Sequence, residues 1–273
     1  MDDAAGAKIL VTGATDGLGR RVASELAATG ATVLLHGRSR ERLETTAEEI
    51  RSETGNEELG SYLADLSSLA EVRALAEQVL SEQDRLDVLV NNAGVIVGER
   101  RESENGYELT FAVNYLAHFL LTDLLLPLLR DSAPARVVNV ASVGQSPVDF
   151  DDVMLERGYD PMRAYRQSKL AQIMFTFELA ERLHDSGVTV NALHPASLMD
   201  TKMVLETFGR SMSTVEEGAE ATVRLAISPD LEGVTGRYFD GTREARANPQ
   251  AYDERARKRL WDLSEELCKK VES

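Results

Sequence analysis

The sequence has few of the features that mark secreted, membrane or nucleic-acid-binding proteins. Its 273 residues include one cysteine, Cys268, so neither an internal disulfide nor a thiolate metal cluster can form. The 30 Lys and Arg residues are outnumbered by 46 Asp and Glu residues, and the net charge of -16 would repel a phosphate backbone. No uninterrupted apolar run approaches the ~20 residues of a membrane span, and residues 1–8 lack an export signal. These absences favour a cytoplasmic protein without nucleic-acid partners or membrane insertion.

The composition that remains is that of an ordinary globular protein. Hydrophobic residues make up 43% of the chain and charged residues 28%, with 19 glycines and 7 prolines, which excludes collagen-like, disordered and coiled-coil proteins. The length allows one large domain or two small ones. Because no repeat, low-complexity tract or Pro/Ser-rich linker divides the chain, we expect a single domain over residues 1–273.

Short apolar runs alternate with longer segments of helical period up to about residue 240. This alternation predicts an α/β fold, a parallel sheet with helices on both faces. Seven strands are expected, at residues 9–11, 29–35, 59–64, 88–90, 137–140, 188–193 and 237–239. Helices are expected at about 18–28, 40–53 and 69–83, and an amphipathic helix over about 249–271 would cover the sheet edge.

A glycine-rich turn follows the first expected strand and leads into a helix, with glycines at Gly13, Gly17 and Gly19. Residues without a Cβ let the backbone turn sharply and approach a pyrophosphate, which then binds at the positive end of the helix dipole. An isolated glycine cluster would equally be a tight turn, but its place in the first of several βα units favours a dinucleotide site. The spacing is Gly-x-x-x-Gly-x-Gly rather than Gly-x-Gly-x-x-Gly.

The second expected strand ends at residues 36–39, which lack the carboxylate that holds the adenosine ribose of NAD. Arg38 stands there instead, and its guanidinium suits a 2′-phosphate, so NADP(H) is predicted over NAD(H). Asp65, after the third strand, could accept a hydrogen bond from the adenine amino group, although it is equally a helix N-terminal signal. The small polar residues 91–94 end the fourth strand, at the sheet edge where ligands bind.

Three side chains carry the expected chemistry. Tyr165 and Lys169 are four residues apart and share one helix face, a spacing that alone often arises by chance. Ser142 strengthens the case because it follows the strand at 137–140, at the same edge as the glycine turn. A nearby ammonium lowers the pKa of a phenol from near 10, so Lys169 is predicted to favour the Tyr165 phenolate. Tyr165 would then exchange a proton with a carbonyl or alcohol oxygen that Ser142 holds.

These motifs, in this order, resemble the short-chain dehydrogenase/reductase family. The resemblance implies a Rossmann-type, doubly wound, seven-stranded parallel sheet. It also implies a fourth catalytic residue, Asn114, which supports a water-mediated proton relay to Lys169, while Lys169 binds the nicotinamide ribose. Hydride would pass directly between cofactor and substrate carbon, with no metal. Residues 35–39, 165–183 and 259–265 resemble the retinol-dehydrogenase-like branch, which does not fix the substrate.

The residues expected around the cofactor come from several turns at one edge of the sheet. They are Gly13, Thr15, Asp16, Gly17, Leu18, Gly19, Arg38, Asp65, Leu66, Asn92, Ala93, Gly94, Tyr165, Lys169, Pro195, Ala196 and Thr201. The catalytic residues are Asn114, Ser142, Tyr165 and Lys169. The chain departs from the family where Pro195 and Ala196 replace the usual Pro-Gly, and where Thr201 supplies a hydroxyl about one residue later than usual.

Two segments are expected near the substrate. The apolar residues 199–208 resemble a mobile lid of this family, although a helix packed on the core would show the same pattern. The acidic residues 146–162 would either border the substrate mouth, where they disfavour anionic substrates, or form a solvated loop. His118 and His184 fall in expected helices away from the ligand edge, and we interpret both as structural.

The leading hypothesis is an NADP(H)-dependent oxidoreductase that reduces a small aldehyde or ketone, or oxidises the corresponding alcohol, with Tyr165 as general acid/base. One alternative is a reductase of a conjugated carbon–carbon double bond, which uses the same hydride and proton. Another is a non-catalytic NADP-binding sensor or scaffold, against which the retention of all four catalytic residues argues. A homo-oligomer is expected from the resemblance, through the helices that carry Asn114 and Tyr165.

Overall fold

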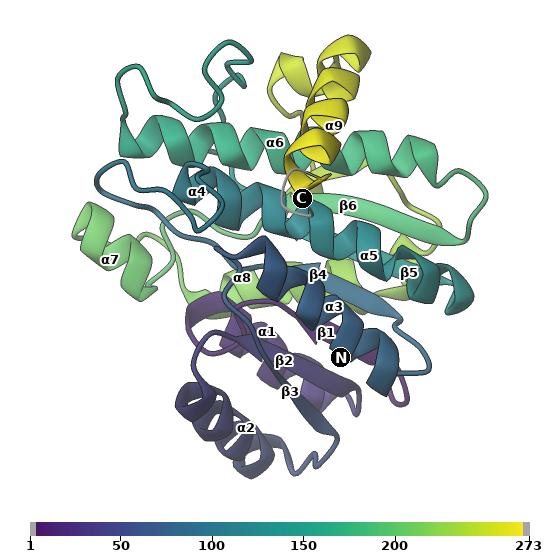
Figure 1. The fold of residues 1–273 in the computed structure, drawn as a ribbon. Coiled ribbons are helices and arrows are strands. Elements are labelled where there is room, and N and C mark those ends of the chain that lie inside the picture. Colours follow the sequence, from purple (N-terminus) through teal and green to yellow (C-terminus); the bar gives the residue numbers. More distant parts are fainter. Residues whose placement is uncertain (1–3, 270–273) are drawn as a thin grey trace.

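The computed structural model describes residues 4–269, and the eight strands in that part of the chain form one sheet (Figure 1). Their order is β3-β2-β1-β4-β5-β6-β7-β8. The strands are β1 (Lys8–Val11), β2 (Thr32–Gly37), β3 (Leu59–Leu63), β4 (Val88–Asn91), β5 (Ala135–Val140), β6 (Val188–His194), β7 (Arg237–Asp240) and β8 (Arg243–Glu244). The first seven pair in parallel, as expected, and β8 adds a short antiparallel strand to β7.

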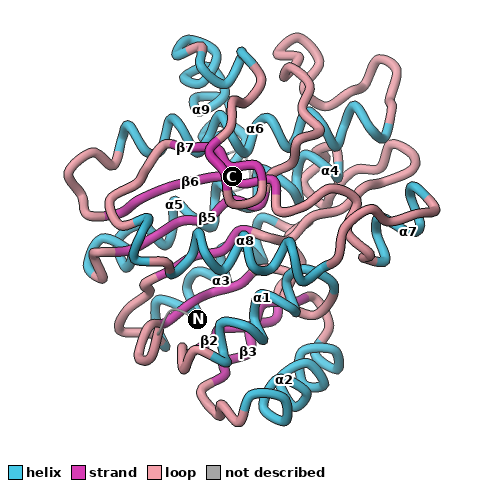
Figure 2. Tube along the Cα trace, turned by 180° about the vertical axis from the view of Figure 1, so that it is seen from behind, coloured by secondary structure: helices cyan, strands magenta, loops and turns pink. Residues whose placement is uncertain are grey.

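Helices cover both faces of this sheet (Figure 2). They are α1 (Gly17–Ala28), α2 (Arg40–Thr54), α3 (Leu69–Glu82), α4 (Leu109–Phe111), the π-helix η1 (Ala112–Leu116), α5 (Ala117–Asp131), α6 (Pro161–Arg182), α7 (Lys202–Phe208), α8 (Val215–Ile227), the 3-10 turns η2 (Pro229–Leu231) and η3 (Pro249–Tyr252), and α9 (Glu254–Lys269). Helices α1, α2 and α8 lie on one face, and α3, α5 and α6 lie on the other. The doubly wound α/β fold predicted from the sequence is therefore confirmed.

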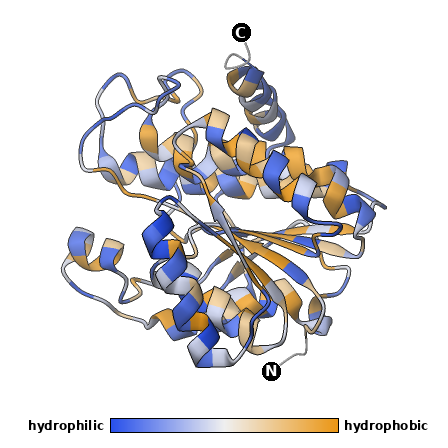
Figure 3. Ribbon diagram, turned by 60° about the horizontal axis from the view of Figure 1, so that its bottom comes forward, coloured by the Kyte–Doolittle hydropathy of each residue, from blue (hydrophilic) through white to orange (hydrophobic). Residues whose placement is uncertain are grey.

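Each strand sends alternate side chains to the two helical layers, because strand side chains point to opposite faces in turn. Leu10 and Leu34 pack with α3, α5 and α6, whereas Ile9 and Val33, one residue earlier in each strand, pack with α1 and α8. Figure 3 shows the resulting apolar sheet between two layers of helices. Both faces are buried, which is why the sequence shows apolar runs rather than alternation.

The strand order reverses beside β1, since β2 pairs with one of its edges and β4 with the other. Connections from β1 and β4 therefore leave to opposite faces, and a crevice opens at the carboxyl ends of these two strands. The glycine-rich turn and residues 91–94 lie at this point. The fold thus brings together the two segments that sequence reasoning assigned to the cofactor.

Two boundaries predicted from the sequence are wrong: the start of strand β2 and the start of the C-terminal helix. Strand β2 begins at Thr32 rather than at residue 29, because Thr29 is the C-cap of α1 and its hydroxyl donates to Leu26 O at 2.7 Å. The C-terminal helix begins at residue 254, and its expected end at 271 lies outside the described residues. It packs on α6 rather than on the sheet edge (Figure 1). Trp261 stacks against Phe175 in this contact.

Residues 109–131 form the longest apolar helical stretch. It is 23 residues long, with a mean hydropathy of 1.5, so by length and composition it could cross a membrane, although polar residues such as Asn114, His118 and Asp123 interrupt its apolar run. Its most apolar window is 78% buried inside the protein. Here it serves as a core helix, made of α4, η1 and α5, that packs on β4, β5 and α3.

Candidate active site

The glycine-rich turn between β1 and α1 is held by close backbone contacts. Gly13 has a φ of 66°, and its N–H donates to Nδ1 of His36 at 3.2 Å. Burial lowers the pKa of His36 to about 4, so the ring is neutral, and its Nε2 donates to Ala64 O at 3.1 Å. A Cβ on Gly19 would lie 2.2 Å from the carbonyl oxygen of Gly13. Glycine is therefore required at position 19.

A second turn, after β4, locks onto the first. The hydroxyl oxygen of Thr12 accepts the N–H groups of Asn92 and Ala93 at 2.9 and 3.0 Å. The Asn92 side chain donates to the carbonyl oxygen of Thr12 at 2.8 Å. At the start of α1, Asp16 is the N-cap and accepts the Gly17 N–H at 2.8 Å. We call these two turns, residues 12–19 and 91–94, the cradle. The cradle places the N-terminus of α1 at the crevice, where a dinucleotide pyrophosphate binds in folds of this kind.

The end of β2 places arginines beside this cradle. Arg38 is exposed directly after the strand, where an NAD-binding chain would carry a carboxylate. Arg42, in the first turn of α2, donates to Thr15 O at 3.1 Å and pairs with Asp16 at 2.8 Å. Sequence reasoning missed Arg42, although the arginines at 40 and 42 that follow Arg38 at a helix start are the signal that could have indicated it.

Asp65 and Leu66 lie where β3 ends, at the rim of the expected adenine site. The Asp65 carboxylate accepts the Ser67 N–H at 2.9 Å, and its own N–H donates to Glu71 at 2.7 Å. Leu66 is buried. The observed bonds are those of a turn leading into α3, which is the helix-start alternative of the sequence reasoning. A contact with adenine stays a prediction.

The carboxyl end of β5 and the start of α6 bring Ser142, Tyr165 and Lys169 together. Tyr165 and Lys169 are one turn apart on α6, with Nζ of Lys169 5.8 Å from the Tyr165 ring centre. The Ser142 hydroxyl is hydrogen-bonded to Tyr165 and accepts the Gly144 N–H at 3.0 Å. A Cβ on Gly94 would lie 3.7 Å from Nζ of Lys169, so the β4 turn borders the same space.

The electrostatics of this set differ from the expectation. Burial raises the pKa of Tyr165, opposed by the hydrogen bond from Ser142, whereas sequence reasoning predicted a lowered pKa. The amine of Lys169 donates to Val140 O at 2.8 Å and to Gln172 at 2.9 Å, and it lies 5.8 Å from the centre of the phenol ring. Burial also lowers the pKa of Lys169 to about 7, so its charge is only partly present at neutral pH. The prediction that the pKa of Tyr165 is lowered is therefore wrong.

Asn114 lies in the π-helix η1, a type of insertion that is common at functional sites. Its Oδ1 accepts the Val95 N–H at 2.7 Å, and its Nδ2 donates to Val95 O at 3.0 Å and Ser168 Oγ at 3.1 Å. The side chain thus ties the β4 turn to α6. Sequence reasoning placed it at the site only through the family resemblance, because it is otherwise a polar residue in a helix.

The segment after β6 reaches the cradle from the other side. A Cβ on Gly17 would lie 3.2 Å from Thr201 Cγ2, which places Thr201 against the glycine turn, while Pro195 is buried and Ala196 is partly exposed. None of residues 202–208 is buried, and Leu205 and Phe208 are 45% and 40% exposed. Helix α7 therefore buries none of its side chains, whereas Met199, at the start of the same segment, packs against the core; a mobile lid stays a prediction.

The acidic residues between β5 and α6 form hydrogen bonds and an ion pair within their own loop and with the start of α6. Asp152 accepts the N–H groups of Glu156 and Arg157 at 2.8 and 3.0 Å. Asp160 is the N-cap of α6, and Asp149 pairs with Arg163 at 2.8 Å. These contacts hold the loop on α6. They give the acids structural partners in addition to solvent.

A small cavity of about 260 Å³ lies beside Ser142. It is lined by Val143, Gln145, Tyr238, Asp240 and residues 245–248. The Tyr238 hydroxyl donates to the carbonyl oxygen of Ser142 at 3.1 Å, and Gln145 Nε2 donates to the same oxygen at 2.9 Å. Sequence reasoning missed Tyr238 and Gln145, because only the return of β7 to the sheet brings Tyr238 next to β5.

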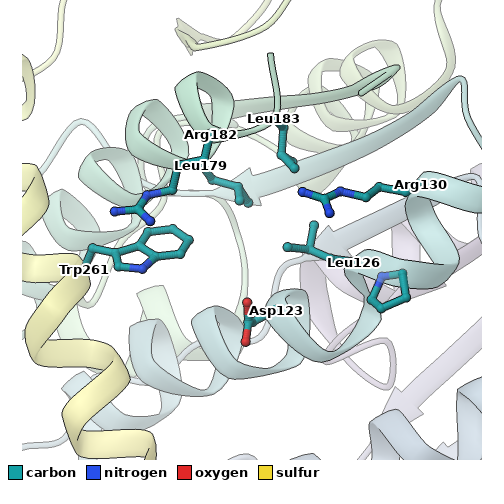
Figure 4. Close-up of a pocket in the computed structure, with 8 residues that line it drawn as sticks. Asp123, Leu126, Arg130, Leu179, Arg182, Leu183 and Trp261 are labelled. Atoms are coloured by element: carbon teal, nitrogen blue, oxygen red, sulfur yellow. The ribbon is translucent and has the colours of Figure 1, made fainter. Parts of the chain in front are cut away.

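A larger cavity, of about 530 Å³, lies among α5, α6 and α9 (Figure 4). Asp123 and Arg130 come from α5, and Arg182 lies over the Trp261 ring at 4.0 Å. It belongs to the outer helical layer rather than to the carboxyl ends of the strands, so size does not mark the active site here.

The two helical histidines have different surroundings. His184 is exposed and pairs with Asp185 at 2.8 Å. His118 is fully buried, and its ring lies 3.5 Å from the Thr12 hydroxyl and 3.0 Å from Gln172. The expectation that His118 lies away from the ligand edge is wrong, because α5 begins directly under the turns that follow β1 and β4.

Comparison with known proteins decides the family. Residues 7–210 match the family model described as short chain dehydrogenase. The chain belongs to the short-chain dehydrogenase family. Retinol dehydrogenase 13 of Mus musculus is 41% identical over 279 residues, covering 96% of this chain and 84% of that one. The similarity supports the retinol-dehydrogenase-like branch.

Solved structures agree with this assignment. An uncharacterized protein from Mycobacterium paratuberculosis has a TM-score of 0.80 and 30% identity, covering 98% of this chain and 96% of that chain. The Pseudomonas aeruginosa RhlG/NADP active-site complex has a TM-score of 0.71 and 32% identity, covering 87% of this chain and 95% of that chain. This short-chain dehydrogenase is therefore an oxidoreductase that acts on CH–OH donors with a nicotinamide cofactor.

Proposed function

We propose that this short-chain dehydrogenase prefers NADP(H), and that it interconverts a small aldehyde or ketone and its alcohol with Tyr165 exchanging the proton. The observation that carries the proposal is the meeting of Ser142, Tyr165 and Lys169 at the edge that also holds the glycine cradle. Arg38, in place of a carboxylate, supports the phosphorylated cofactor. The similarity to RhlG, whose complex contains NADP, supports the same choice.

The residues of the chain fit the cofactor from end to end. Gly19 lets the start of α1 pack closely against the backbone of Gly13, and α1 offers its N-terminus to the pyrophosphate. Arg38 would hold the 2′-phosphate, and Lys169 would hold the nicotinamide ribose. A bound nicotinamide supplies or accepts the hydride.

Tyr165 is suited to donate a proton in the direction of carbonyl reduction. Burial raises its pKa, so the phenol is protonated at neutral pH and can protonate the alkoxide that forms from the carbonyl. Ser142 shares a hydrogen bond with the phenol, so the two hydroxyls would bind one substrate oxygen between them. In alcohol oxidation the phenol must first lose its proton, which a charged Lys169 favours.

The substrate would lie between the catalytic hydroxyls and two differing walls. The cavity beside Ser142 has polar walls at Gln145, Asp240 and Asn248, whereas α7 offers the apolar side chains of Leu205 and Phe208. A carbonyl compound with one polar and one apolar part suits this arrangement. A cytoplasmic location and a homo-oligomeric state stay predictions.

A panel of aldehydes and ketones tests the proposal. We expect loss of NADPH absorbance with at least one carbonyl, formation of the matching alcohol, and a higher kcat/KM for NADPH than for NADH. Product analysis separates carbonyl reduction from reduction of a conjugated double bond. An enzyme that consumes NADH as efficiently as NADPH would contradict the cofactor choice.

A further inference from the structure

A buried chain of hydrogen bonds runs from Lys169 into the protein, away from the crevice. Nζ of Lys169 donates to Oε1 of Gln172 at 2.9 Å, and Nε2 of Gln172 lies 3.0 Å from Nδ1 of His118. Because the amide oxygen faces the amine, the amide NH₂ must face the histidine, whose Nδ1 is then the acceptor. The ring proton lies on Nε2, 3.5 Å from the Thr12 hydroxyl. The bonds from Lys169 to Gln172 and from Gln172 to His118 therefore run in one consistent direction.

All three members of this chain are withdrawn from solvent. Gln172 and His118 are 0% exposed, and Lys169 is 4% exposed. Burial lowers the pKa of His118 to about 3, assisted by the charge of Lys169, so the ring stays neutral and Nδ1 remains an acceptor. Buried polar groups are costly where apolar side chains would fill the same space. Their arrangement behind the amine indicates a task beyond packing.

We propose that Gln172, held in place by His118, is a positioning residue for Lys169 that fixes the direction of the amine and favours its charged form. This inference rests on the proposed function in one respect, the assignment of Lys169 to the catalytic set. Val140 O supplies the second acceptor. With two of its three hydrogens directed inward, the ammonium has one hydrogen left for the crevice.

The charge of Lys169 responds to this environment near neutral pH, because burial lowers its pKa to about 7. Three titratable groups face it from the elements packed around it: Tyr165 on its own helix, His118 on α5 and His194 on β6. Loss of the Gln172 oxygen would remove a partner that favours the ammonium and lower the pKa further. A carboxylate at the same place would raise it.

Titration of the lysine itself tests the proposal. The full-length chain has six lysines, so labelling them with ¹³C at Cε gives few NMR signals, and Lys169→Arg assigns the relevant one. We expect Gln172→Met to move the Lys169 midpoint down and Gln172→Glu to move it up, each by about one pH unit or more. His118→Leu should act like Gln172→Met, because the amide loses its anchor. His118→Asn should restore the parent midpoint, since its amide oxygen can replace Nδ1.

The control is Thr122→Val, one turn along α5 from His118. Thr122 is equally buried and accepts a hydrogen bond from Asn91 at 2.9 Å, outside the chain that ends at Lys169. It should lower the thermal unfolding temperature without moving the Lys169 midpoint. Midpoints that stay constant in Gln172→Met and Gln172→Glu, or that move equally in Thr122→Val, would overturn the proposal.

Turnover gives a second readout. Gln172→Met should lower kcat at neutral pH and recover as the pH falls, because the lysine is then charged again, while Gln172→Glu should extend activity to higher pH. The titration needs neither substrate nor cofactor, so its failure overturns only the positioning role. Full activity in Tyr165→Phe would instead overturn the proposed function and leave the titration result standing.

Discussion

The cofactor-facing and substrate-facing halves of the crevice are built in different ways. The cradle is a set of short strand ends and turns in which Gly13, Gly19 and Asn92 leave no freedom, and its partners Thr12 and His36 are buried. The predicted lid, α7, is a seven-residue helix with no buried residue. A rigid, backbone-defined site suits a ligand shared by many enzymes, whereas a loosely packed wall suits a substrate that varies.

The largest expected effect on this contrast comes from low pH, which should destabilise the fold through the buried His36 that holds the cradle. His36 has a pKa of about 4 in the folded protein, against 6.5 when unfolded, so stability is complete above pH 6.5. As the pH falls from 6.5 towards 4, the unfolded chain binds a proton that the folded chain excludes, and about 3 kcal/mol is lost. His118 adds a loss of the same sign.

Chemical denaturation across this pH range measures the effect. His36→Asn keeps an acceptor for the Gly13 N–H but cannot titrate, so its unfolding free energy should depend less on pH. If the parent and His36→Asn lose stability in parallel, His36 does not hold the cradle as described.

Gly19→Ala changes the backbone of the cradle directly. The added Cβ would lie 2.2 Å from the backbone oxygen of Gly13, so the turn must shift, and NADPH binding should weaken by about 100-fold. Fluorescence titration of NADPH measures it. Gly98→Ala is the matched control, because a Cβ there meets nothing within 4 Å. Equal affinity in both variants would show that the pyrophosphate lies elsewhere.

Arg38→Ala tests how the cofactor half of the crevice selects NADPH over NADH. Loss of a charge-assisted bond of roughly 1.5–3 kcal/mol should weaken NADPH binding by about 10-fold or more, while NADH binding stays nearly constant. Arg40→Ala removes another exposed arginine two residues away and should change neither. Equal losses for both dinucleotides in Arg38→Ala would refute a 2′-phosphate contact.

The smallest effect is expected in the lid. Leu205 is 45% exposed, so Leu205→Ala should change the unfolding free energy by about 0.5 kcal/mol or less. Leu26, fully buried on α1, should cost about 2–5 kcal/mol when changed to alanine. If Leu205→Ala is as destabilising as Leu26→Ala, the helix packs on the core and is not a lid.

The same contrast explains which parts of the fold and of the site could be predicted from the sequence. The strands, the glycine cradle and Asn92 follow from local rules, since the apolar runs and turn residues are contiguous in the chain. The surroundings of Lys169 do not, because His118 and Gln172 come from two helices whose contact only the folded sheet creates. The direction of the lysine amine depends on Gln172, one turn along α6, which is itself held by His118 from the distant helix α5.

The central claim is that Tyr165 exchanges the proton beside the bound nicotinamide, and Tyr165→Phe tests it most directly. With Tyr62→Phe as the matched control, on the far edge strand β3, single-turnover reduction of an accepted carbonyl by NADPH should slow by about 10²–10⁴-fold in the first variant and stay unchanged in the second. A Tyr165→Phe enzyme that binds NADPH normally and reduces the carbonyl at the parent rate would contradict the account.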